Sequence, residues 1–396
     1  MKRPALLLVI LAYLAFISLG LPDGVLGVAW PSIRHTFAVP FGYLGMLLAG
    51  MAAGFLVSSL SGGQLVERLG IGKLLLVSSS LVAISLFGFT FAATWWQLLI
   101  FAVVLGMGGG AIDTGMNSYA AANFNHRQMN WLHASYGVGA MLGPIVMTIV
   151  LASGTAWQVG YLLIGALLAG LALCFGLTRR RWREGRPDEP ESPESPQPVA
   201  MRGLLRRPLV WQSVALFFFY TGLEVTAGNW SFSLFTIERG IAEEVAGMWV
   251  GIYWASLTVG RFMFGFISER FSARAILRTS MLTVPVAVLV FWWGGVPLLS
   301  FLALALIGFM LAPIYPLMTA QTPNRVGRAA APHVIGFQVA AAGVSSSILS
   351  GLVGVLVNSF GLEVIGPFLL ANALILLLLH ESILRNDAVQ ARQAVA

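Results

Sequence analysis

The sequence predicts an all-α membrane protein with twelve transmembrane helices in two six-helix pseudo-repeat bundles. Three observations support this prediction. Of the 396 residues, 58% are hydrophobic and only 10% are charged, whereas soluble proteins have about 25% charged residues. The apolar residues form twelve separate windows along the chain, and one loop motif occurs twice.

Each apolar window is about 20 residues long, which is enough for a helix to cross roughly 30 Å of hydrocarbon. Backbone polar groups in lipid must bond internally, so each window is expected to be helical. The first window follows Lys2 and Arg3. It is too long for a signal peptide and has no small-residue cleavage site, so we interpret it as a retained helix. The windows centre near Leu14, Met51, Val82, Gly106, Met141, Leu167, Phe219, Tyr253, Val286, Leu306, Ser346 and Leu374.

The distribution of basic residues indicates membrane topology and argues against nucleic-acid binding. Of 23 Lys and Arg residues, only Arg34 and Arg239 fall in loops on one side, and Arg261 lies within the eighth window. The others lie at the termini and in alternate loops. By the positive-inside rule, we expect a multi-pass protein of the cytoplasmic membrane with both termini in the cytoplasm. Trp95–Trp96 and Trp292–Trp293 fall at predicted outer helix ends, where tryptophan anchors helices at the interface.

A hydrophilic linker separates the first six windows from the last six. It begins with TRRRWREGR at Thr178, continues as PDEPESPESPQP and ends with RGLLRRP. Proline, serine and acidic residues without periodicity predict a flexible loop, and its basic ends are expected to contact anionic headgroups. The predicted domains are an N-terminal six-helix bundle (1–178), a cytoplasmic linker (179–208) and a C-terminal six-helix bundle (209–396).

One loop motif relates the two halves. The loop after the second window reads GQLVERLGIGK from Gly63 to Lys73, and the loop after the eighth reads GFISERFSAR from Gly265 to Arg274. The shared Gly-x-x-x-Glu-Arg core recurs 202 residues later (265 minus 63). Repeated halves are typical of transporters that bind their substrate at the interface of the repeats.

This repeated loop resembles the GxLxxERxG motif of the major facilitator superfamily, which occurs between helices two and three and again between helices eight and nine. The first copy differs by one place, since its basic residue is Lys73. The resemblance implies the major facilitator fold. It also implies that Glu67, Arg68, Glu269 and Arg270 form cytoplasmic charge networks that stabilise one conformation. Ordinary topogenic charge is the alternative interpretation of these four residues.

A narrower resemblance is to the fucose-permease-like group of sugar:proton symporters. It rests on Asp23 within PDGVLGVAWPSI, on Ile112–Asn117 (IDTGMN) and on Met129–Pro144 (MNWLHASYGVGAMLGP). The resemblance implies proton-coupled sugar transport. The chain departs from the group at His133, where the fucose permease has a glutamine, and at Glu224, where a neutral polar residue is expected.

Three carboxylates, Asp23, Asp113 and Glu224, lie alone in long uncharged stretches. An ionisable group at bilayer depth costs roughly 2.5–3.5 kcal/mol and usually faces a water-filled path or a partner. A carboxyl group that alternates between an apolar surrounding and water also changes its affinity for protons. We therefore predict that these three residues couple transport to protons.

The spacing gives the three acids different places. Counting 1.5 Å per residue puts Asp23 roughly 26 Å from the inner helix end and Asp113 about 24 Å from the outer end. Asp23 is then in the outer half and Asp113 in the inner half, which suggests a relay. Glu224 follows Asp23 by 201 residues and is its expected repeat counterpart, whereas Asp113 maps onto Tyr315. The alternatives are a solvated acid near the outer end for Asp23 and a structural hydrogen bond to a neighbouring helix for Glu224.

Polar and aromatic residues near these acids are candidate substrate ligands. Asn117 follows Asp113 by four residues and shares its helix face, and an acid beside an amide can both accept from and donate to hydroxyl groups. Sugar rings also pack on aromatic side chains. Each aromatic residue has the alternative of a lipid-facing or core position, and His133 that of an interface residue. The candidates are Asn117, His133, Tyr136, Asn229, Trp230, Tyr253, Tyr315 and Gln338.

Glycines and the single cysteine carry other interpretations. The run from Gly106 to Gly110 predicts close helix packing, because no strand precedes it as a dinucleotide site requires. The segment from Gly139 to Pro144 resembles the Gly-Pro motif of antiporters. Cys174 is the one cysteine and cannot form an internal disulfide.

The leading functional hypothesis is secondary active transport: proton-coupled uptake, or symport, of a small polar solute by alternating access, with a monosaccharide as the leading candidate. The alternative is proton-coupled efflux of an amphipathic drug-like compound or metabolite. A sensor is disfavoured because we identify no appended soluble domain. An enzyme is disfavoured because neither HExxH nor GxSxG occurs. We expect a monomer whose partners are the substrate, protons and lipids, with no cofactor, metal or nucleic acid.

Overall fold

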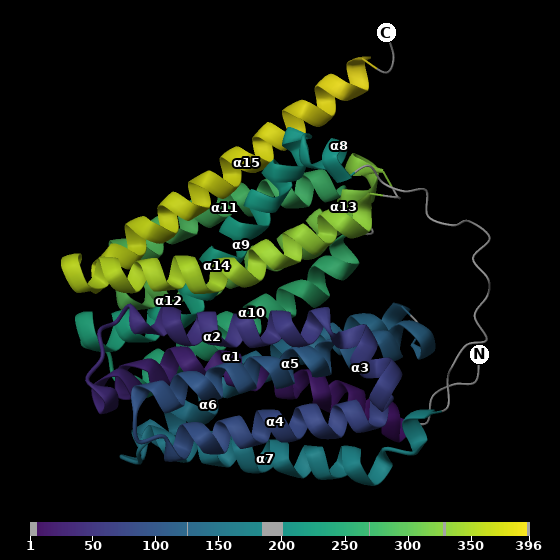
Figure 1. The fold of residues 1–396 in the computed structure, drawn as a ribbon. Helices are drawn as coiled ribbons and strands as arrows, with labels where there is room; N and C mark the ends of the chain where they lie inside the picture. The colour runs from purple at the N-terminus through teal and green to yellow at the C-terminus, as the bar shows by residue number, and fades with distance from the viewer. Residues whose placement is uncertain (1–5, 125, 184–200, 269, 328–329, 394–396) are drawn as a thin grey trace. The chain divides into compact units, whose positions relative to one another are not determined.

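The computed structural model describes residues 6–124, 126–183, 201–268, 270–327 and 330–393. These residues are mostly helical and contain no β-strand (Figure 1). The α-helices are α1 (Leu6–Phe37), α2 (Tyr43–Leu60), α3 (Gly62–Leu69), α4 (Ile71–Phe91), α5 (Trp95–Asn123), α6 (His126–Ala152), α7 (Trp157–Thr178), α8 (Met201–Leu205), α9 (Pro208–Ser233), α10 (Glu243–Ile267), α11 (Ala273–Trp293), α12 (Pro297–Leu311), α13 (Ile314–Val326), α14 (Ala331–Phe360) and α15 (Ile365–Gln393).

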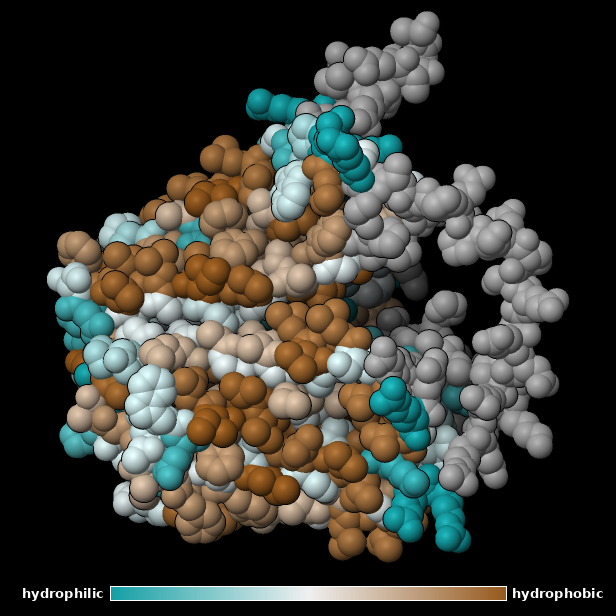
Figure 2. Space-filling view, viewed as in Figure 1, coloured by the Kyte–Doolittle hydropathy of each residue, from teal (hydrophilic) through white to brown (hydrophobic). Residues whose placement is uncertain are grey.

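Twelve helical spans among the described residues are long and apolar enough to cross a membrane. Each contains the centre of one predicted window, so the predicted number of transmembrane helices is confirmed. The seventh span joins α9 to a π-helical turn at Leu234–Glu238, and the tenth joins α12 to α13. Figure 2 shows hydrophobic side chains over much of the visible helix faces, while hydrophilic ones gather toward the helix ends.

Helix contacts divide the chain into two compact units. Unit 1 consists of Met1–Pro190 with Gly228–Ala255, and unit 2 consists of Glu191–Ala227 with Ser256–Ala396. The boundaries between them therefore fall within α9 and α10 as well as in the linker. The predicted domains, with their division at residues 179–208, stay a prediction. In that linker, the described residues form a 3₁₀ turn (Arg181–Arg183) and α8.

Unit 1 contains three closely packed helix pairs: α1 with α6, α2 with α5, and α4 with α7. The first pair is in direct backbone contact, because a Cβ atom on any of four glycines would collide with the opposite helix. Such small residues let membrane helices approach closely. The four glycines are Gly20 and Gly24 on α1, and Gly139 and Gly143 on α6.

The glycine run of α5 has the same role in the second pair. A Cβ atom on Gly106 would collide with the backbone of Met51, and one on Gly110 with Phe55 and Ser58, all on α2. From the other side, Gly54 of α2 lies against the backbone of Val103. The prediction of close helix packing at Gly106–Gly110 is therefore confirmed.

Unit 2 has a corresponding order of helix pairs. Gly222 of α9 lies against Ser345 and Leu349 of α14, and the Ser345 hydroxyl donates to the carbonyl of Phe218. Gly260 of α10 packs against the end of α12, and α11 pairs with α15. In each half of the sequence, the first transmembrane helix thus pairs with the fifth, the second with the fourth and the third with the sixth.

The tryptophans at the predicted outer helix ends have different surroundings. Trp96 and Trp293 are largely exposed, as interfacial anchors should be. Trp95 is buried, and its ring contacts those of Trp30 and Tyr43. Trp95 is therefore a packing residue at the start of α5, which begins with a capping box formed by Thr94 and Gln97.

Candidate functional site

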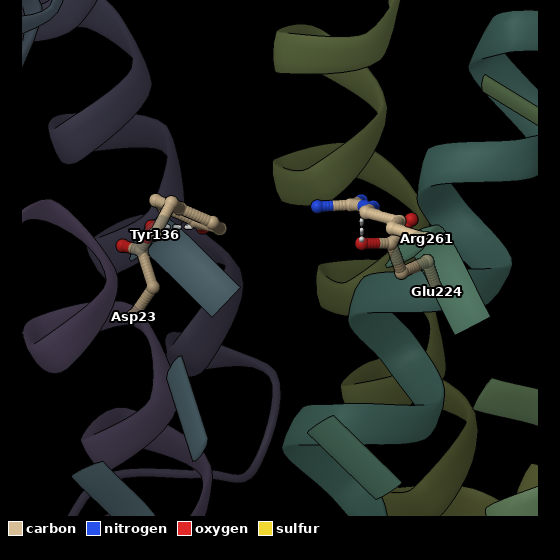
Figure 3. A network of polar contacts seen from close by, with 4 residues as sticks. All are labelled: Asp23, Tyr136, Glu224 and Arg261. Carbon is tan, nitrogen blue, oxygen red and sulfur yellow. Dashed lines mark hydrogen bonds and ion pairs between the residues drawn. The ribbon is translucent and has the colours of Figure 1, made fainter. Parts of the chain in front are cut away.

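The carboxylate of Asp23 accepts a hydrogen bond from the Tyr136 hydroxyl on α6, with 2.7 Å between Oη and Oδ2 (Figure 3). Asp23 is half-buried. It lies 17 residues after the start of α1 and 14 before its end at Phe37, so about 21 Å of helix follows it. Asp23 is therefore near the middle of a long helix, which does not fit the alternative of an acid near the helix end.

Two glycines explain why the side chain of Asp23 contacts that of Tyr136. Gly20 and Gly24 flank Asp23 by one turn or less, and both touch the backbone of α6. Gly20 faces the carbonyl of Tyr136 itself. With the two backbones in contact, a tyrosine side chain is long enough to reach the carboxylate on the neighbouring helix.

Asp113 pairs within its own helix. The Asn117 amide donates to the Asp113 carboxylate with 3.0 Å between Nδ2 and Oδ1, and both side chains are half-buried. The predicted shared face is confirmed. The Asn117 amide keeps a second N–H that can donate, and the acid keeps a second oxygen that can accept, so the pair can both donate to and accept from a hydroxyl group.

Glu224 has a charged partner. Its Oε1 lies 3.5 Å from Nη2 of Arg261 on α10, and the two side chains are 11% and 28% exposed (Figure 3). Sequence reasoning identified both residues as ionisable groups within apolar windows but did not connect them. Their opposite charges were the available signal, because charges at bilayer depth usually pair.

The predicted repeat counterparts therefore have partners of different kinds. Asp23 accepts from a neutral tyrosine, whereas Glu224 pairs with a cation. With the 202-residue offset, Tyr136 corresponds to Gln338 on α14. Gln338 is buried and exchanges hydrogen bonds of 3.2 and 3.4 Å with Thr322 on α13. The two halves thus repeat their helix pairing but differ in their polar contacts.

Tyr315 belongs to an aromatic cluster in unit 2. Its ring lies edge-on to Phe217, with 4.8 Å between centroids, and tilted against Tyr220 at 5.9 Å. Tyr220 precedes Glu224 by one turn of α9. The aromatic cluster and the Glu224–Arg261 pair are therefore one turn apart on α9, through Tyr220 and Glu224.

Three predicted substrate ligands lie in packed surroundings in unit 1. Asn229 is 4% exposed, and Trp230 and Tyr253 are fully buried. The Trp230 ring packs on Phe41, and the Tyr253 ring packs on its neighbour Trp254. Rings buried this way act as core in the conformation described, and their contact with substrate stays a prediction.

The remaining candidates are at the ends of helices. His133 is exposed near the start of α6, and its ring lies edge-on to Phe16. Arg68 and Arg270 are exposed. Glu67 lies in α3, but its side chain and the whole of Glu269 are outside the described residues, so the cytoplasmic charge networks stay a prediction. Among the described residues, no cluster of three or more His, Cys, Asp or Glu side chains offers a set of metal ligands.

Comparison with known proteins identifies relatives along most of the chain. A family model described as "Major Facilitator Superfamily" matches residues 12–242 and 225–393. The glucose/mannose transporter GlcP of Bacillus subtilis is 21% identical over 348 residues, which cover 86% of each protein. The sodium-dependent glucose transporter 1A of Mus musculus is 26% identical, over 63% of this chain and 66% of that one.

Solved structures share the fold. A bacterial homolog of the human lysosomal transporter Spinster, in an inward-facing and occupied conformation, aligns with a TM-score of 0.77 at 12% identity over 96% of both chains. A D-xylose-proton symporter aligns with a TM-score of 0.72 at 16% identity, over 93% of this chain and 96% of that one. At these identities the likeness shows the fold alone.

Proposed function

This chain belongs to the Major Facilitator Superfamily, and we propose that it takes up a monosaccharide together with protons by alternating access. Membership of the family makes it a multi-pass membrane transporter. The sugar is supported by the relatives named as glucose/mannose and glucose transporters. We also propose that the protein lies in the cytoplasmic membrane with both termini in the cytoplasm. This orientation follows from the distribution of basic residues.

The observation that carries proton coupling is that two membrane-embedded acids have neutral partners. Asp23 is bonded to Tyr136, and Asp113 to Asn117. Such a carboxyl group can take up and release a proton without leaving an opposite charge uncompensated. Protonation of Glu224 would instead remove the negative charge that faces Arg261, which is costly away from water. We therefore assign proton coupling first to Asp113, with Asp23 as its relay, and Glu224 has the weaker case.

The hydrogen bond between Asp113 and Asn117 also offers a way for substrate to act on Asp113. A sugar hydroxyl that inserted between Asp113 and Asn117 could donate to the carboxylate and accept from the amide N–H. Substrate binding would then alter the surroundings of the proton-carrying acid. This is the differential affinity that coupled transport requires.

The efflux alternative has no support from the Gly-Pro segment of α6. Gly139 and Gly143 lie against the backbone of α1, and the Pro144 ring lies next to Gly24. Helix packing thus accounts for these residues whatever the direction of transport.

The test is uptake by the purified full-length protein in proteoliposomes. With an acidic exterior, we expect labelled glucose, mannose or xylose to accumulate above equilibrium, and a protonophore to abolish the accumulation. Failure of every hexose and pentose in a broad panel, with protein that unfolds cooperatively, would overturn the sugar assignment. Accumulation driven by sodium but not by protons would overturn proton coupling alone. Net extrusion would overturn uptake.

A further inference from the structure

Arg261 lies on the packed face of α10 rather than on the face with large exposed apolar side chains. Leu257, one turn earlier, is 1% exposed, whereas the next residues, Phe262 and Met263, are 39% and 45% exposed. The partly exposed guanidinium is therefore not on the helix face whose side chains are suited to lipid contact. It extends toward α9, where it meets Glu224 (Figure 3).

The surroundings of the pair on α9 are suited to a sugar. Tyr315 is half-buried, and its ring packs against Tyr220, which is 1% exposed and lies one turn before Glu224. Tyr315 is therefore the ring that can face a solute near the pair, with Tyr220 packed behind it. Aromatic rings provide surfaces for the C–H faces of a sugar ring, and charged groups bond strongly to hydroxyls. An arginine in such a position would ordinarily bind a carboxylate, because the guanidinium matches its geometry.

We infer that the Glu224–Arg261 pair is a charge filter that makes the transporter accept neutral sugars and reject sugar acids. This inference rests on the proposed transport of monosaccharides. Glu224 supplies the carboxylate that Arg261 would otherwise take from a solute. A sugar acid must displace a carboxylate that is part of the fold, and it then brings a second negative charge beside Glu224. A neutral sugar needs neither change.

The ion pair masks a binding group for anions. Replacing the Glu224 carboxylate with an amide of nearly the same shape removes the negative charge that faces Arg261. Arg261 then becomes a binding group for the carboxylate of a hexuronate. Glu224→Asp retains the negative charge and is the matched control, since it changes the length of the side chain but not the charge balance.

The experiment compares binding of D-glucose and D-glucuronate, which share a ring and differ in one carboxylate. Equilibrium binding to the purified full-length protein is measured for wild type, E224Q, E224D and E224Q/R261Q. We expect wild type and E224D to bind glucose at least about tenfold more tightly than glucuronate. E224Q should bind glucuronate at least about tenfold more tightly than wild type does, and E224Q/R261Q should lose that gain.

Each outcome has a distinct meaning. Wild type that binds neither sugar, nor any other neutral sugar, would contradict the proposed function. Wild type that binds glucose and glucuronate equally well would overturn the charge filter alone, as would folded E224Q without a gain for glucuronate. If E224Q is too unstable to assay, glucuronate should raise its melting temperature more than glucose does, because it restores a partner for Arg261. Equal effects of the two sugars would overturn the inference.

Discussion

Tyr136 donates a 2.7 Å hydrogen bond to Asp23 across the α1–α6 pair, at the point where Gly20 brings the two backbones into contact. The residues are 113 positions apart in the sequence. The bond therefore depends on helix packing as well as on the two side chains. Changes to the donor, to the acid and to the glycines test different parts of this arrangement.

Removal of the donor tests the bond directly. Tyr136→Phe deletes the hydroxyl and leaves the ring in place. We expect a loss of about 1.5–3 kcal/mol in the free energy of unfolding if the Asp23 carboxylate is charged. Proton-driven accumulation should also decrease, since the relay acid loses its partner.

The matched control is Tyr161→Phe. Tyr161 is a buried tyrosine of unit 1, whereas Tyr136 is half-buried, and the Tyr161 hydroxyl has no hydrogen-bond partner among the described residues. This substitution should leave stability unchanged or slightly raised. Equal losses for the two variants would show that the bond to Asp23 contributes nothing.

Neutralisation of the two acids tests proton coupling. Asp113→Asn and Asp23→Asn cannot carry a proton but retain hydrogen-bonding capacity. We expect both variants to lose accumulation under a proton gradient, with the larger loss at Asp113. Sugar exchange at equal concentrations, which needs no net proton movement, should continue. The measurement is labelled sugar uptake in proteoliposomes with and without the gradient. Full accumulation by both variants would remove the relay from the mechanism.

The α1–α6 contact can be tested through its glycines. Gly20→Val places side-chain atoms where the Tyr136 carbonyl lies. Overpacking of this kind costs about 1–3 kcal/mol or more, and it should also separate Asp23 from Tyr136. We expect a lower melting temperature and reduced transport. Gly170→Ala in α7 is the control, because a Cβ atom there meets nothing within 4 Å. It should stabilise the helix by up to about 1 kcal/mol. Similar behaviour of the two variants would contradict the packing role of Gly20.

These residues show which contacts a sequence predicts. The twelve spans follow from the length of the apolar windows, and the Asp113–Asn117 bond follows from helix geometry over four residues. Both are local. The bond from Tyr136 to Asp23 requires knowledge of which helices pair and how each is rotated about its axis. The glycine positions on α1 and α6 indicate how each helix is rotated, but only once it is known that these two helices pair.

Buried aromatic residues illustrate a second limit. Trp230 and Tyr253 have the side chains of sugar ligands, yet both are fully buried. The residue type does not distinguish a ring packed in the core from a ring that lines a binding site, because both kinds of ring exclude water equally well. Arg261 was predictable in part. A lone cation and a lone anion within apolar windows require partners, but a separation of 37 positions leaves the identity of the partner open.

A double-mutant cycle separates the structural contribution of the Glu224–Arg261 pair from its role in selectivity. Either single neutralisation, E224Q or R261Q, removes one charge of the pair and keeps the other, and should cost about 3–5 kcal/mol if the remaining charge stays away from water. The double variant E224Q/R261Q should cost much less than the sum of the two, because it removes both charges together. Arg278→Gln is the control. Arg278 pairs with Glu381 at 3.1 Å but is 54% exposed, so its loss should cost only about 0–1 kcal/mol. Unfolding of purified protein monitored by temperature or denaturant gives all four values. Additive effects of the two single variants would show that the pair has no energetic coupling, and would leave Arg261 without the partner that the charge filter requires.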